Sequence, residues 1–161
     1  MTTPTTDPTT STAVAIGNDH PDHNRPDHNR PDHNRPDHNL WPAVSCLDVP
    51  GVRRWLAALG FDEGICIVDD DGVTVHHSEM LWPEGGRVMV SSAAKSDPTF
   101  IVPAGAGSCY VVCDDPDVVF ARAGALGAHV LRPMEETDYD SRGFTLADSE
   151  GNRWSFGTYA G

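Results

Sequence analysis

Residues 148–159 read DSEGNRWSFGTY, a tight polar turn followed by a strand in which large aromatic residues alternate with small ones. Gly151 and Asn152 are expected to supply the positive-φ positions that a tight hairpin requires. The alternation of Trp154 and Phe156 with Ser155 is typical of a strand with one buried face. This segment therefore predicts the closing hairpin of a small domain.

Upstream of this hairpin the chain contains one arrangement of elements twice. The first copy opens with a strand at 41–47, and Asp48 is a candidate N-cap for a helix with Pro50 in its first turn. Apolar residues at helical spacing continue to Gly60, a C-cap signal. Turn-forming sequences separate the three strands that follow. These strands are expected at 63–69, 73–81 and 86–92.

The second copy repeats the order strand, helix, strand, strand, strand. A strand at 108–113 precedes a helix at 116–127, which ends at Gly127 as the first helix ends at Gly60. Residues 93–107 join the two copies. The last three strands are expected at 129–135, 142–147 and 153–159.

The duplicated module, together with the terminal hairpin, resembles the glyoxalase/bleomycin-resistance/extradiol-dioxygenase superfamily, also called vicinal oxygen chelate proteins. The segments WPEGG at 82–86 and WSFGT at 154–158 are similar to a glyoxalase-like bacterial subgroup. The resemblance implies an α+β fold of two βαβββ modules, at about 41–92 and 107–159, within a domain at 40–161. It also implies curled mixed sheets around an open cleft, helices outside, and a homodimer.

Residues 1–39 have a different character, with PDHNR repeated from Pro21 onward and truncated at Asn39. A five-residue period with proline in every copy fits neither helix nor strand, so we expect a disordered tail. The tail holds five of the eight histidines of the chain. They are either weak ligands for Zn²⁺, Ni²⁺ or Cu²⁺ or the product of a repeat expansion without function.

The net charge is −13, of which residues 41–161 carry −10. Phosphate would be repelled, which argues against nucleic acid or an anionic membrane as partner. The excess of acidic residues indicates either an ordinary solvated surface or a protein that prefers a cationic ligand. Four cysteines lie in apolar runs and match no zinc pattern, so we expect buried reduced thiols and a cytoplasmic protein. No apolar run is long enough to span a bilayer.

The metal-dependent members of the superfamily place one ligand on the first and last strand of each module. Carried over residue by residue, these positions fall on the following side chains: Trp41, Met89, Ser108 and Ser155. None of them is an established ligand for a hard or borderline divalent cation. We therefore expect no metal and no cofactor, which removes the usual mechanism of glyoxalases and extradiol dioxygenases.

Other side chains offer chemistry without a metal. His77 and Glu79 are two apart on a strand and share a face, so they are either a general acid–base pair or solvated groups at the rim. Arg142 is either a clamp for an anionic group or a salt-bridge partner of its own acidic loop. In similar proteins a Tyr-Gly-x-Arg run stands before this strand, and here Asp140 replaces the glycine.

A cleft could be lined by Trp41, Trp82, Met89 and Tyr110, with Arg142 and Ser155 as further ligand contacts; the alternative for the aromatic residues and Met89 is core or dimer-interface packing. The first functional hypothesis is a metal-free binding protein of the bleomycin-resistance type. The second is an enzyme of the lyase, isomerase or dioxygenase type, either metal-independent through His77 and Glu79 or with metal ligands at other positions. The third is a domain for oligomerisation or regulation.

Overall fold

The computed structural model describes residues 40–95, 97, 99 and 102–161. The predicted tail lies outside these residues, so its disorder stays a prediction. The first module contains β1 (Ala43–Cys46), α1 (Val49–Leu59), β2 (Asp62–Val68), β3 (Val75–Leu81) and β4 (Arg87–Ser92). The second contains β5 (Ser108–Val112), α2 (Pro116–Ala125), β6 (His129–Glu136), β7 (Arg142–Ala147) and β8 (Arg153–Gly157). In the described part, no helix is long and apolar enough to cross a membrane.

Each module forms its own mixed sheet, and the two sheets have the same topology. The strand orders are β1-β4-β3-β2 and β5-β8-β7-β6. In both, the first strand pairs in parallel with the last, and the remaining pairs are antiparallel. The predicted fold class is confirmed: α+β, with two βαβββ modules and sheets that do not close.

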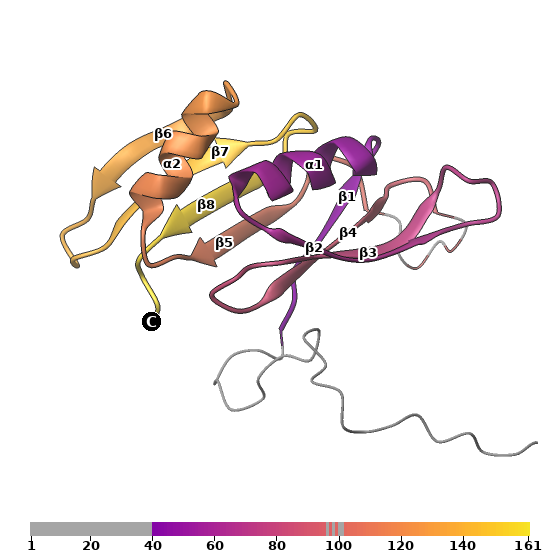
Figure 1. Cartoon of the computed structure of the whole chain (residues 1–161), viewed down its shortest axis with the longest axis horizontal. Coiled ribbons are helices and arrows are strands. Elements are labelled where there is room, and N and C mark those ends of the chain that lie inside the picture. The colour runs from indigo at the N-terminus through magenta and orange to yellow at the C-terminus, as the bar shows by residue number, and fades with distance from the viewer. Residues whose placement is uncertain (1–39, 96, 98, 100–101) are drawn as a thin grey trace, which may run out of the picture.

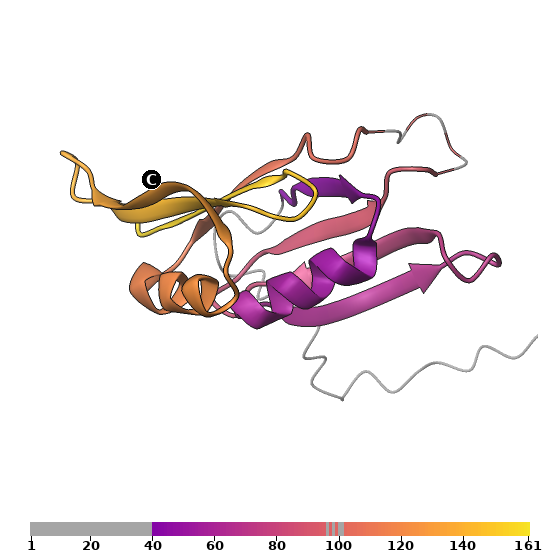
Figure 2. The same ribbon diagram turned by 90° about the horizontal axis from the view of Figure 1, so that it is seen from above.

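Figures 1 and 2 show the modules side by side, each with its helix over one face of its own sheet. The helices also contact each other. We call the helix-free face of each sheet its open face; it carries His77, Glu79 and Met89 in the first sheet and Tyr110 and Ser155 in the second. The neighbouring residues of these strands point the other way and form the core.

The core is continuous across the two modules because aromatic rings from both meet in it. Phe61 lies 5.0 Å from Trp82 and 6.2 Å from Trp154, measured between ring centroids. Phe156 stacks on Phe144 at 5.3 Å. Fully burying one such side chain contributes about 1.5–3 kcal/mol, so this cluster ties the modules together.

Local capping explains where α1 begins and ends. The Asp48 carboxylate accepts a hydrogen bond from the Gly51 amide at 2.9 Å, and Gly60 has a φ of 124° at the C-cap. Both ends of α1 are also contacted by the second module. Glu150 Oε1 accepts from the Asp48 amide at 2.7 Å, and Arg122 Nη1 donates to the Leu59 carbonyl at 3.0 Å. A cation at this end also complements the helix dipole.

The terminal hairpin forms as predicted, but Asn152 acts in a different way. Gly151 has a φ of 97°, whereas the φ of Asn152 is not positive. The Asn152 side chain is instead fully buried: its Oδ1 accepts from the Gly107 amide at 2.9 Å, and its Nδ2 donates to Asp148 Oδ2 at 2.9 Å. Asn152 therefore stabilises the junction between β8 and the start of β5 rather than the turn itself.

Two further expectations change or sharpen. Cys66 is exposed, while the other three cysteines are buried; it lies on β2, none of whose residues is buried. Asp140 has a φ of 57°, so it adopts the left-handed conformation that the glycine of similar proteins favours. The loop before β7 thus keeps a glycine-like bend without a glycine.

Candidate functional site

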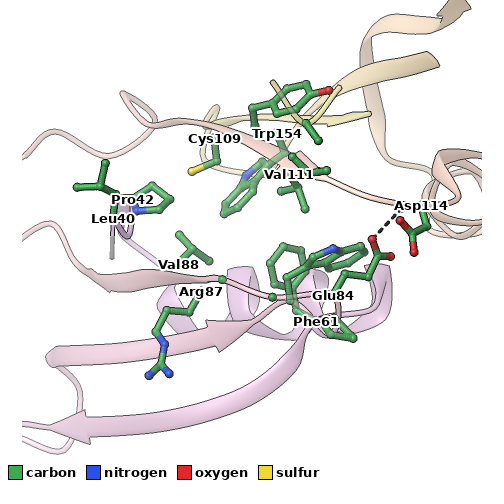
Figure 3. A pocket seen from close by; sticks show the side chains of 17 residues that line it. Leu40, Pro42, Phe61, Glu84, Arg87, Val88, Cys109, Val111, Asp114 and Trp154 are labelled. Atoms are coloured by element: carbon green, nitrogen blue, oxygen red, sulfur yellow. Dashed lines mark hydrogen bonds between the residues drawn. The ribbon is translucent and has the colours of Figure 1, made fainter. Parts of the chain in front are cut away.

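A cavity of about 760 Å³ opens between the two modules, where the β3–β4 turn and the start of β4 face β5. Figure 3 shows this arrangement, with Val88 and Arg87 on one side and Cys109 and Val111 on the other. Its volume is within the range of pockets that enclose a small organic molecule. The residues that matter for its chemistry are Phe61, Trp82, Glu84, Tyr110, Asp114 and Trp154.

The walls of the cavity are apolar and aromatic. Trp82 and Trp154 belong to the buried core that both modules share, whereas Tyr110 is half exposed on the open face. The Tyr110 hydroxyl accepts a hydrogen bond from the Tyr159 amide at 3.1 Å, which holds its ring beside the cavity. Rings of this kind favour a flat aromatic occupant.

Cys109 also lines the cavity, but it is not a nucleophile at neutral pH. Burial, assisted by the charge of Asp148, raises the pKa of the Cys109 thiol to about 11. Because the thiolate is the reactive species, this cysteine acts as an apolar wall.

One end of the cavity is acidic. Glu84 and Asp114 meet there, and Glu84 Oε2 accepts from the Asp114 amide at 2.8 Å, as Figure 3 shows. Burial and then the nearby charge of Glu84 raise the pKa of Cys113 to about 12. Arg87 also lines the cavity, but its charge is already paired with Glu79, and its Cζ lies 4.6 Å from the centre of the Trp41 ring. This end of the cavity therefore favours a cation.

Of the ligand contacts predicted from the sequence, Trp82 and Tyr110 line this cavity. Trp41 is not a lining residue, but its ring stacks on Arg87, which lines the cavity. Met89 and Ser155 lie on the open faces, where Met89 pairs with Glu79, and Ser155 Oγ is 2.9 Å from Thr145 Oγ1. The predicted set thus divides between the cavity and the open faces.

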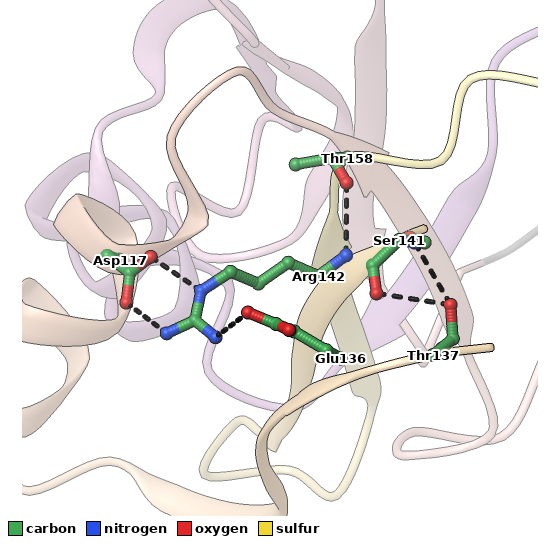
Figure 4. A network of polar contacts seen from close by, with 6 residues as sticks. All are labelled: Asp117, Glu136, Thr137, Ser141, Arg142 and Thr158. Carbon is green, nitrogen blue, oxygen red and sulfur yellow. Dashed lines mark hydrogen bonds and ion pairs between the residues drawn. The ribbon is translucent and has the colours of Figure 1, made fainter. Parts of the chain in front are cut away.

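Arg142 lies outside the cavity lining and is engaged by two carboxylates (Figure 4). Its Nε and Nη2 donate to the two oxygens of Asp117 at 2.8 and 2.7 Å, and its Nη1 donates to Glu136 at 3.3 Å. The hydrogen bonds from Arg142 hold the pKa of Asp117 below its usual value. Arg142 therefore forms a salt bridge, as one of the two alternatives predicted, and its partners include Asp117 on α2 as well as Glu136.

His77 and Glu79 do share the open face of β3, with His77 Nε2 3.1 Å from Glu79 Oε1. Arg87 pairs with the other oxygen of the same carboxylate. Burial alone would raise the pKa of Glu79, but the hydrogen bonds from His77 and Arg87 outweigh it, so the pKa lies below its ordinary value. Glu79 is therefore ionised at neutral pH. It is better suited to orienting the imidazole of His77 than to transferring a proton itself.

Of the carried-over metal positions, Met89, Ser108 and Ser155 lie on the open faces, and Trp41 lies just before β1. Among the described residues, no group of three or more His, Cys, Asp or Glu side chains could hold a metal ion. A metal-free protein stays a prediction, since it depends on the carry-over of Trp41, Met89, Ser108 and Ser155.

Four residues of the cavity lining were not predicted from the sequence as ligand contacts: Phe61, Glu84, Asp114 and Trp154. Glu84 lies in a turn, and Asp114 lies just before a helix, 30 residues away along the chain. Only the docking of the two modules brings them together. The aromatic character of Phe61 and Trp154 indicated burial but not proximity to a cavity.

The strand orders, the duplicated βαβββ module and the helix-covered faces define the fold of the glyoxalase/bleomycin resistance protein/dioxygenase superfamily, and the chain has this fold. TioX from Micromonospora sp. ML1 is 24% identical, with a TM-score of 0.59 over 76% of this chain and 96% of that chain. A glyoxalase/bleomycin resistance protein from Catenulispora acidiphila DSM 44928 is 20% identical, with a TM-score of 0.54 over 74% of this chain and 96% of that one.

TnmS3 from Streptomyces sp. CB03234, described as an antibiotic binding protein, is 19% identical, with a TM-score of 0.55 over 71% of this chain and 88% of its own. Neither the protein-family models nor the curated proteins compared with this chain gave a match.

Proposed function

We propose that this protein binds a small, partly aromatic and cationic molecule in the cavity between its modules and sequesters it without chemical change, as a metal-free protein of the bleomycin-resistance type. The observation that carries the proposal is the cavity itself, which combines aromatic walls with Glu84 and Asp114 at one end. The antibiotic-binding TnmS3 has the same fold, which supports this reading.

The proposal includes a homodimer. Apolar side chains on the open faces support it, because Ile67, Tyr110 and Val112 are each more than 40% exposed in the single chain. A second copy would cover such a surface. The unbridged cysteines of the described part support a reducing, cytoplasmic location.

Proflavine, a planar aromatic cation, is a suitable probe for the site. We expect it to quench tryptophan fluorescence on binding, with an affinity that falls as salt is added, because the attraction is partly long-range. The double variant Glu84→Gln/Asp114→Asn should bind it about fivefold more weakly. Asp138→Asn is the matched control, since Asp138 is exposed in the β6–β7 loop and outside the cavity lining.

A preference for an aromatic carboxylate over proflavine, with affinity lost in Arg142→Ala, would contradict the proposal. It would favour an enzyme that acts on anionic substrates.

A second candidate function is a metal-independent enzyme, favoured by the contact of 3.1 Å between His77 Nε2 and Glu79 Oε1. In that case Glu79 would orient the imidazole and His77 would be the base. Incubation with thiol adducts of small dicarbonyl compounds tests it. Turnover that is abolished by His77→Gln and retained in Glu84→Gln would establish this function in place of sequestration.

A further inference from the structure

Trp82 lines the cavity, and its indole N–H is a buried hydrogen-bond donor. Trp82 is only 8% exposed, and its Nε1 has no hydrogen-bond partner among the described residues. No other buried side-chain nitrogen or oxygen in the described part shares this condition. A buried donor without a partner destabilises the folded state, so native proteins rarely retain one without a reason.

Trp154 offers a direct comparison within the same cavity lining. Its indole N–H donates to Asp148 Oδ2 at 3.1 Å, so this donor is satisfied inside the protein. The indole ring of Trp82, in contrast, packs against Phe61 at 5.0 Å and Phe156 at 6.1 Å between ring centroids. A phenyl ring would make similar contacts, and packing therefore does not explain why the donor is present.

We propose that the Trp82 N–H determines ligand specificity by donating to a neutral hydrogen-bond acceptor on the occupant, such as an aromatic ketone or a ring nitrogen. This inference rests on the proposed function, since it concerns the same cavity. A site that offers a buried donor rejects an analogue that lacks the acceptor, because the donor is then left unpaired. Shape and charge alone would not give this discrimination.

The charges around Trp82 restrict the acceptor further. Glu84 is two residues away in the same turn, which is closed by hydrogen bonds from the Gly85 amide to the Trp82 carbonyl at 2.9 Å and from the Trp82 amide to the Gly86 carbonyl at 3.1 Å. With Glu84 and Asp114 at this end, a carboxylate acceptor would be repelled. The occupant is therefore an aromatic molecule with two polar features: a neutral acceptor for Trp82 and a cationic amine for the two carboxylates.

A matched pair of probes tests this inference: aminomethyl-fluorenone and aminomethyl-fluorene, which share the ring skeleton and the amine and differ in one carbonyl. Calorimetry on the full chain should show the ketone binding about tenfold more tightly than the hydrocarbon. In Trp82→Phe, which keeps an aromatic ring and removes the donor, the preference should disappear. Comparison of the four affinities isolates the hydrogen bond from the other contacts.

A spectroscopic measurement keeps the test independent of the variant's folding. In the ¹⁵N-labelled wild-type protein, the Trp82 indole proton should shift downfield when the ketone binds and change much less with the hydrocarbon. Equal affinities for the two probes together with an unshifted indole proton would overturn the inference and leave the proposed function standing. If neither amine binds at all, the proposed function fails at this cavity and the inference fails with it.

Discussion

Asp148 shows how a single side chain holds the terminal hairpin. It is buried, and its carboxylate accepts hydrogen bonds from the backbone amides of Glu150 and Asn152 and from the side chains of Asn152 and Trp154. The spacing of aspartate, asparagine and tryptophan in residues 148–159 is therefore a hydrogen-bond motif. One acceptor satisfies donors from the turn and from the core at the same time.

Replacing this carboxylate should destabilise the protein strongly. Asp148→Ala is expected to lower the free energy of unfolding by about 2–4 kcal/mol, because the buried donors of Asn152 and Trp154 lose their acceptor. Urea denaturation measures the loss. Asp138→Ala, at an exposed position, is the control and should stay within about 0.5 kcal/mol of wild type. Equal stabilities of the two variants would show that the network contributes little.

Glu79 gives stability a defined pH dependence. Its pKa is lowered in the folded state, so its contribution is complete above the ordinary glutamate value of about 4.3 and is lost as the pH falls through the lower folded-state value. The advantage over Glu79→Gln should therefore be constant from pH 7 to 5 and shrink below pH 4. Urea denaturation of the wild type and of Glu79→Gln across this range measures it. An advantage as large at pH 3 as at pH 7 would contradict the assignment.

At the scale of the elements, β7 and β8 pair so closely that glycine is required at one position. Gly143 pairs with Gly157, and a Cβ on Gly143 would stand 2.6 Å from the Phe156 carbonyl oxygen. Because that atom belongs to the backbone, it cannot move aside without disturbing the strand pairing. In α2, by contrast, a Cβ on Gly124 would have no neighbour within 4 Å.

The same substitution should thus have opposite effects in the two elements. Gly143→Ala is expected to lower the free energy of unfolding by about 1–3 kcal/mol through overpacking. Gly124→Ala should raise it by about 0.5–1 kcal/mol, because glycine is a poor helix former. Thermal and urea denaturation of both variants measure these changes. A stabilised Gly143→Ala would mean that the β7–β8 pairing differs from the one described.

At the scale of the whole molecule, the open faces should form the interface of a homodimer. Ile67 is 46% exposed on the first open face, where it pairs with His77. Ile67→Lys should shift the protein toward monomer in analytical ultracentrifugation, because a charge would be buried at the interface. Val73→Lys is the matched control, since Val73 is 77% exposed in the β2–β3 turn. A wild-type protein that is monomeric at tens of micromolar would contradict the prediction.

Removal of residues 1–39 should leave the folded domain intact. We expect this proline-rich segment to be solvated and to contribute no buried area, so its deletion should change Tm by no more than about two degrees. A drop of several degrees would indicate that the tail docks on the domain.

The protein without residues 1–39 should contain no stoichiometric metal by elemental analysis. One tightly held Zn, Ni, Fe or Mn ion per chain would instead revive a lyase or dioxygenase function.

Local signals explain why the fold could be predicted from sequence. The caps at Asp48 and Gly60, the alternation in 153–157 and the repeated order of elements all depend on residues close together in the chain. The predicted strands and helices accordingly agree with the structure to within a few residues at their ends. One such difference is in the first strand, which begins at Ala43 rather than at the predicted Trp41.

The site depended on contacts that no local pattern encodes. Glu84 meets Asp114, Phe61 meets Trp154, and Arg142 pairs with a carboxylate of α2 only after the two modules have docked. Asn152 was assigned to a turn conformation because sequence reasoning weighs backbone preference, whereas its burial and its bond to Gly107 follow from tertiary packing. The chain alone thus specified the elements and their duplication, because caps and periodicity are short-range. Tertiary structure decided which side chains share the cavity, because that depends on packing between residues distant in sequence.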